Sequence, residues 1–131
     1  METNRWIFPI QKYEDEEWKK TEDYLRVSMS WRFTDSWEKP GGGVIVAGHY
    51  SLGLANSTTE DVQFILRSIQ FNDQNAKEIA VYEIAPEESI LIPINTPKTF
   101  SADFDIELNS LKTANQIAII GSLGSAFFIP K

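Results

Sequence analysis

The run LRVSMSWRFT, residues 25–34, decides the fold class. Arginine, serine and threonine alternate in it with apolar residues, which occupy every second position: Leu25, Val27, Met29, Trp31 and Phe33. A period of two is the period of a β-strand, whose successive side chains point to opposite faces. The run therefore predicts a strand with one face in the core and the other in water.

Similar alternation recurs along the rest of the chain. Further strands are predicted at 44–55, 62–71, 78–84, 89–94 and 99–107, and one or two in 116–129 around a turn at Gly121 to Gly124. The alternation changes parity near Ser68, which predicts a bulge there or a strand buried on both faces. Gly48 and Gly53 favour another bulge. About eight short strands between polar turns favour an antiparallel β-sandwich of the immunoglobulin-like kind.

Two segments before residue 44 carry other signals. Residues 13–25 lack glycine and proline and place Asp15 before Lys19, and Glu16 before Lys20, at helical spacing. This pattern predicts one short N-terminal helix, lying across an end or edge of the sheet with Trp18, Thr21 and Leu25 on one side. The run TDSWEKPGGG, residues 34–43, gathers turn-forming residues and predicts a mobile loop.

Length and composition indicate one globular domain. The 131 residues suffice for a single core. We expect one β-sandwich domain over 1–131, in which 1–43 form the helix, the first strand and the glycine-rich loop, and 44–131 form the main body of strands. With 19 acidic and 12 basic side chains the net charge is −7, which argues against binding to nucleic acid. The absence of cysteine excludes disulfides, thiolate zinc sites and cysteine nucleophiles.

The sequence leaves the compartment open. The first residues, METNRW, lack the basic and apolar regions of a signal peptide. The longest apolar stretch, 117–130, is too short and too interrupted by glycine and serine to cross a bilayer. We therefore expect no membrane span and a soluble protein, either cytoplasmic or exported with its signal peptide removed.

Residues 44–107 carry a family resemblance. A strand ends in Asn56, a polar turn follows, and the next strand closes on Asn72 before a second polar turn. Ile92-Pro93 and the spaced pair Phe100 and Phe104 come later. This order resembles the immunoglobulin-like domains of the late-embryogenesis-abundant WHy and FxLYD kind. The resemblance implies a β-sandwich fold and a non-enzymatic role, and it carries over no catalytic residue.

The sequence offers no catalytic set or metal site. The sole histidine, His49, has no local nucleophile or carboxylate, so we interpret it as structural or as a surface residue. Asp103, Asp105 and Glu107 alternate with apolar residues, which is typical of a solvated strand face and less so of a calcium site. We accordingly predict no catalytic residue, no metal and no cofactor. An enzyme whose carboxylates are spread along the chain is the least favoured hypothesis.

The tryptophans suggest a ligand site. All four lie in the first 37 residues, and flat exposed aromatics are one means by which a β-sandwich can bind sugars. We expect Trp31 in the core and Trp18 packed against the sheet, which leaves Trp37 exposed. The candidate ligand-binding residues are Trp37, His49 and Tyr50.

Two functional hypotheses remain open. The leading one is a non-enzymatic β-sandwich that works by contact with a protein partner or with its own copies, because apolar strand edges must be covered. The alternative is a small-ligand or carbohydrate-binding module that uses its exposed aromatics.

Overall fold

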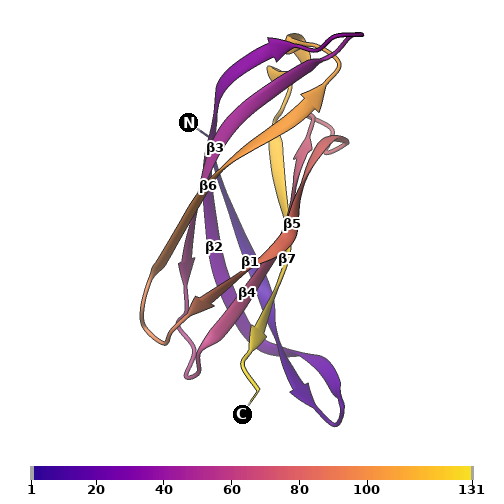
Figure 1. The fold of residues 1–131 in the computed structure, drawn as a ribbon. Coiled ribbons are helices and arrows are strands. Elements are labelled where there is room, and N and C mark those ends of the chain that lie inside the picture. Colours follow the sequence, from indigo (N-terminus) through magenta and orange to yellow (C-terminus); the bar gives the residue numbers. More distant parts are fainter. Residues whose placement is uncertain (1, 131) are drawn as a thin grey trace.

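The computed structural model describes residues 2–130 and contains seven strands and one short helix (Figure 1). The elements are β1 (Glu2–Glu14), β2 (Glu17–Glu38), β3 (Val44–Ala55), β4 (Val62–Asn72), β5 (Glu78–Ile92), β6 (Lys98–Leu108), α1 (Leu111–Ala114) and β7 (Ile119–Phe128). The prediction of a mainly β protein is confirmed. Among residues 2–130 no helix is long and apolar enough to cross a membrane.

The strands form a single mixed sheet in the order β5-β4-β7-β1-β2-β3-β6. All neighbouring pairs are antiparallel except β1 and β7, which run parallel and pair only at Ile10–Ala126 and Gln11–Phe127. The arrangement therefore differs from the predicted antiparallel sandwich of two sheets. Two antiparallel parts, β1-β2-β3-β6 and β7-β4-β5, join through this short parallel pairing.

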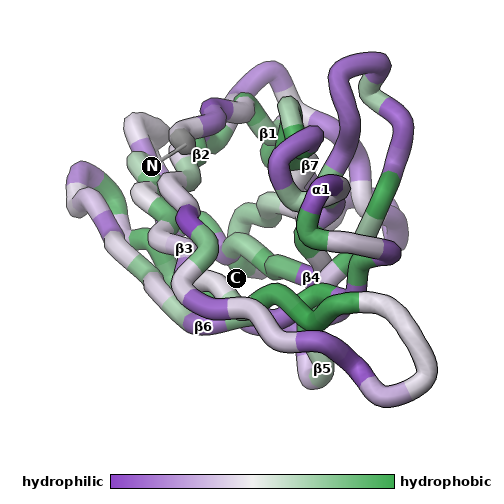
Figure 2. Tube along the Cα trace, turned by 90° about the horizontal axis from the view of Figure 1, so that it is seen from above, coloured by the Kyte–Doolittle hydropathy of each residue, from purple (hydrophilic) through white to green (hydrophobic). Residues whose placement is uncertain are grey.

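The sheet curls until its two edge strands meet. Seen from above, the strands follow one another around a ring (Figure 2). The ring centroids of Tyr82 on β5 and Phe104 on β6 lie 6.0 Å apart. In the interior, the ring centroid of Phe71 on β4 lies 5.9 Å from that of Trp31 and 5.4 Å from that of Phe104. The body is thus nearly closed and barrel-like. Its aromatic core brings together side chains from strands that are not neighbours in the sheet.

The period-two pattern places side chains as predicted. Leu25, Val27, Met29 and Trp31 of β2 are buried, and the predicted apolar face of β3 is buried with them: Val44, Val46, Tyr50, Leu52 and Leu54. Arg26 and Arg32 on the other face of β2 are exposed. The bulge predicted near Ser68 is confirmed, because the register of β4 shifts between Leu66 and Ser68 against both neighbours.

The predicted N-terminal helix over 13–25 is wrong, because these residues form a β-hairpin. Glu14 pairs with Glu17 across the two-residue turn of Asp15 and Glu16, whose φ angles are +54° and +65°. Lys19 Nζ does contact Asp15 Oδ2, at 3.0 Å, but across this tight turn. The i,i+4 spacing that indicates a helix also occurs across a hairpin turn, and pairing along the rest of β1 selects the strand.

Three other segments depart from expectation. The strands predicted at 78–84 and 89–94 are parts of one strand, β5. The predicted loop over 34–43 is strand up to Glu38, because Asp35 to Glu38 pair with Ala47 to Val44 after a bulge in β2. Only the end is a turn, in which Gly41, Gly42 and Gly43 all take positive φ. The segment 116–129 holds one strand, β7, which runs through Gly121 and Gly124 without a turn and pairs with β4 along its length.

Candidate functional site

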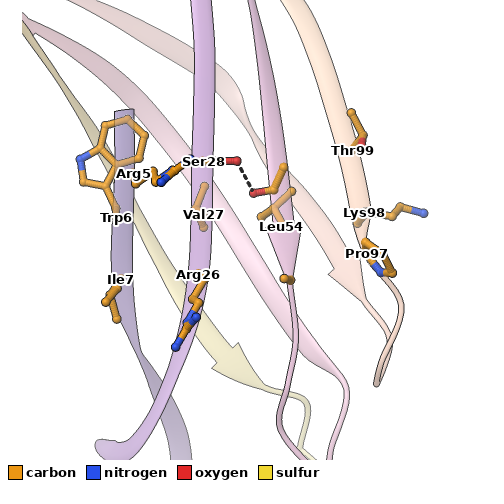
Figure 3. Close-up of a pocket in the computed structure, with 12 residues that line it drawn as sticks. Arg5, Trp6, Ile7, Arg26, Val27, Ser28, Leu54, Pro97, Lys98 and Thr99 are labelled. Atoms are coloured by element: carbon orange, nitrogen blue, oxygen red, sulfur yellow. Dashed lines mark hydrogen bonds between the residues drawn. The ribbon is translucent and has the colours of Figure 1, made fainter. Parts of the chain in front are cut away.

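The candidate site is an open groove of about 1080 Å³ across β1, β2, β3 and β6 (Figure 3). Pairing aligns Arg5 with Ser28, Ser28 with Gly53 and Gly53 with Thr99, so one row of residues crosses all four strands. The neighbouring row runs from Ile7 through Arg26 to Ala55. Because these residues alternate with buried Val27 and Leu54, the groove lies on the outer face of the sheet.

The groove exists because its middle residues are small. Ser28, Gly53 and Ala55 lie on the two central strands, while the longer side chains of Arg5 and Ile7 stand on β1 beside them. At Gly53 a Cβ atom would lie 2.9 Å from Ser28 Oγ, so any larger residue here would displace the Ser28 hydroxyl. Side chains of ordinary size at these central positions would fill the floor.

Three cations line the groove: Arg5, Arg26 and Lys98. None of the three forms an ion pair with a carboxylate among residues 2–130. No aspartate or glutamate belongs to the lining, although the chain as a whole carries seven more acidic than basic residues. The groove is therefore a positive site on a negative protein, and an anionic group bound there meets no carboxylate in the wall.

The lining also has an apolar component. Ile7 is 62% exposed, Pro97 is exposed at the β6 end, and Trp6 is half-buried and packs against the core. A ligand that combines negative charge with apolar side chains can therefore use both features. Arginine suits such contacts, because its planar guanidinium binds a carboxylate through two parallel hydrogen bonds and also stacks on flat groups.

The three candidate residues from the sequence do not converge. Tyr50 is buried, and its ring lies 6.3 Å from that of Phe100 and 6.1 Å from that of Phe104. His49 points to the opposite face of β3, where its Nδ1 lies 2.8 Å from Asp103 Oδ1. Trp37 is 46% exposed near the end of β2 and pairs with Ile45, four residues from His49 along β3.

The other tryptophans and the acidic strand are placed as follows. Trp31 is buried as predicted, whereas Trp18 lies on β2, 44% exposed, with its ring 4.8 Å from that of Phe127. On β6, Asp103 contacts His49, and Glu107 Oε1 lies 2.9 Å from Lys39 Nζ. Within residues 2–130 no three acidic or histidine side chains gather closely enough to hold a metal ion.

No family model matches this chain, and no curated protein matches it. Among solved structures, the chain is similar to one described as the X-ray structure of Northeast Structural Genomics Consortium target SoR45. The identity is 12% and the TM-score is 0.47, over 81% of this chain and 87% of that chain.

The groove was not predicted from the sequence. The alternation predicts that Arg26 and Ser28 lie on the face toward water; Arg26 is exposed and Ser28 is half-buried. The contributions of Arg5, Gly53 and Lys98 depend on which residue of each strand stands opposite which, and that register is set by partners remote in sequence. A surplus of small residues on the outer face of two consecutive strands is the signal that points to the groove.

Proposed function

We propose that the protein is a non-enzymatic binding domain whose groove holds an acidic, extended segment of a protein partner. The observation that carries the proposal is that Arg5, Arg26 and Lys98, none of which has an ion-pair partner among residues 2–130, line one groove that has no acidic residue in its lining. In a chain of net charge −7 this selects for anionic groups at one place on the surface.

The shape of the groove favours a peptide segment. Its volume of about 1080 Å³ lies just above the usual size of small-molecule pockets, and the groove is open to solvent. An extended segment places side chains alternately on two sides, so acidic residues can reach the cations while apolar residues contact Ile7 and Pro97. Nucleic acid is disfavoured, because the remainder of the surface carries excess negative charge.

The test uses a fluorescein-labelled octapeptide in which glutamate and leucine alternate. We expect it to bind the wild-type protein, as measured by fluorescence anisotropy, and to bind the double variant Arg5→Gln/Arg26→Gln about tenfold more weakly. Exposed charge pairs contribute roughly 0.2–1 kcal/mol each, and two of them give about this factor. Ala55→Phe, which places a ring on the groove floor, should weaken binding through sterics alone.

The matched control is Arg32→Gln. Arg32 is also an exposed arginine on β2 without an ion pair among residues 2–130, but it lies outside the groove. Its variant should bind the peptide like the wild type, and a peptide with lysine in place of glutamate should bind none of the proteins. Equal affinities of the Arg5/Arg26 and Arg32 variants would refute the groove as the binding site.

We also propose that the two antiparallel parts of the sheet stack as layers of an immunoglobulin-like sandwich, as the resemblance of residues 44–107 to WHy and FxLYD domains implies. Its support is that the parts share only two ladder pairs, while rings such as Trp31 and Phe71 connect them through the interior. We expect nuclear Overhauser effects between the protons of these two rings. We expect none between the backbones of β5 and β6, because no ladder joins these two edge strands.

A further inference from the structure

We infer that the acidic segment held by the groove is the β1–β2 hairpin tip of a second copy of this chain. The hairpin tip is defined as Tyr13 to Trp18. This inference rests on the proposed function and names the partner of the same groove. It predicts association of one copy to the next through two different surfaces, the tip of one and the groove of the other.

The hairpin tip carries negative charge, which complements the positive charge of the groove. Four consecutive acidic residues, Glu14 to Glu17, form it, and all four are exposed. Asp15 and Glu17 share Lys19, whose Nζ lies 3.0 and 3.7 Å from their oxygens. Glu14 and Glu16 form no ion pair among residues 2–130, so two carboxylates are free to meet the groove cations.

The hairpin tip also has apolar groups to offer. Tyr13 and Trp18 stand opposite each other in the ladder, their rings 5.4 Å apart, and are 50% and 44% exposed. Aromatic rings with a polar edge are favoured in protein interfaces. The tip thus combines exposed carboxylates with exposed rings, and the groove combines exposed cations with Ile7, Trp6 and Pro97.

The position of the hairpin permits docking. It extends past the ends of the neighbouring strands at one end of the molecule, at the lower right in Figure 1. Beyond Gln11, which pairs with Phe127, the two strands of the hairpin form ladder pairs only with each other. A two-stranded ribbon of this kind can enter a groove that a broad surface cannot.

The contact cannot form within one molecule. The groove includes Ile7 and the tip begins at Tyr13, on the same strand β1. From Ile7 to Glu14 the strand spans about 23 Å at roughly 3.3 Å per residue, and its ladder with β2 keeps it extended. The occupant must therefore be another copy, and because the two surfaces differ, the contact is heterologous and leads to rings or open chains.

The test uses two variants that each lack one half of the contact. The groove variant is Arg5→Gln/Arg26→Gln, and the tip variant is Glu14→Gln/Glu16→Gln. In sedimentation-velocity experiments at low salt, the average mass of the wild type should rise with concentration beyond that of a dimer. Each variant alone should remain monomeric in the same range, because its apparent dissociation constant is at least tenfold weaker.

Mixing the two variants is the decisive step. The groove variant keeps its tip and the tip variant keeps its groove, so the mixture should form a 1:1 dimer and stop there. The control for the tip is Glu78→Gln/Glu83→Gln, two exposed acids on β5 that remove the same charge and should leave association unchanged. Circular dichroism checks that all variants are folded.

The outcomes separate this inference from the proposed function. If the wild type stays monomeric at all concentrations but its groove still binds the glutamate–leucine peptide, the second copy is excluded as the partner and the binding function stands. If association survives in both variants, or the mixture yields no dimer, the tip-to-groove contact is overturned. If neither peptide nor copy binds, both proposals fail.

Discussion

At the scale of single residues, Tyr50 makes stability depend on pH. Burial raises the pKa of its phenol to about 12, and Tyr82 and Glu88 add to the effect through their charges. An unfolded tyrosine ionises near pH 10, so between about pH 10 and 12 the unfolded state loses the proton first. The contribution is fully present below pH 10 and is lost as the pH rises through the folded pKa, about 2 kcal/mol by pH 11.5.

Urea denaturation at pH 8 and pH 11.5 measures this loss, with Tyr50→Phe as the reference. The prediction concerns the difference between the two proteins, because any effect of high pH that is common to both cancels. The wild type should lose about 2 kcal/mol more than the variant, because the variant has no phenol to ionise at this position. A loss equal in both would show that folding does not raise the pKa of the Tyr50 phenol.

At the scale of elements, residues 13–25 can be tested by substitution, because a hairpin and a helix predict opposite changes in the free energy of unfolding. Asp15 and Glu16 both take positive φ in a two-residue turn, a conformation that asparagine and glycine adopt more readily. Asp15→Asn/Glu16→Gly should therefore raise the free energy of unfolding by about 0.5–1 kcal/mol and slow amide exchange in the hairpin. Loss of the exposed Lys19–Asp15 pair subtracts little.

The comparison variant is Asp15→Ala/Glu16→Ala. Alanine is the best helix former, so a helix over 13–25 would become more stable with this change, whereas the hairpin turn would become less stable. The two variants must therefore shift stability in opposite directions, by thermal or urea unfolding, if the hairpin is correct. Stabilisation by the alanine pair would restore the helix interpretation.

The same hairpin shows how far sequence reasoning reaches at this scale. The strand over 25–33 was predictable because one face of β2 alternates strictly and is buried by the core. Its partner β1 contains the consecutive apolar run Trp6 to Ile10, which does not alternate with polar residues, so no local pattern predicts a strand there. When the pairing with β1 is not known, the spacing of acidic and basic residues over 15–20 favours a helix. The groove cannot be predicted either, because it requires Arg5 beside Ser28.

At the scale of the whole molecule, the interior rather than the sheet holds the two antiparallel parts together. Their ladder consists of two residue pairs, whereas the ring of Phe71 on β4 contacts those of Trp31 and Phe33 on β2 and of Phe104 on β6. Phe71 is fully buried, so Phe71→Ala removes contacts from both parts at once. We expect a loss of about 3–5 kcal/mol in the free energy of unfolding.

The tryptophans allow the cooperativity of this body to be measured. All four lie on β1 and β2, so their fluorescence reports on the four-stranded part and, through the rings that Phe71 and Phe127 place beside Trp31 and Trp18, on its contact with the other part. Far-ultraviolet circular dichroism reports on the entire sheet. Because the parts share one aromatic core, the two probes should give the same urea midpoint in the wild type, and Phe71→Ala should shift both together. Phe71→Leu, which retains more of the buried volume, serves if the alanine variant does not fold. A fluorescence midpoint above that of circular dichroism would show that β1-β2-β3-β6 persists after β7-β4-β5 has unfolded, and that the ring contacts of Phe71 do not couple the two parts.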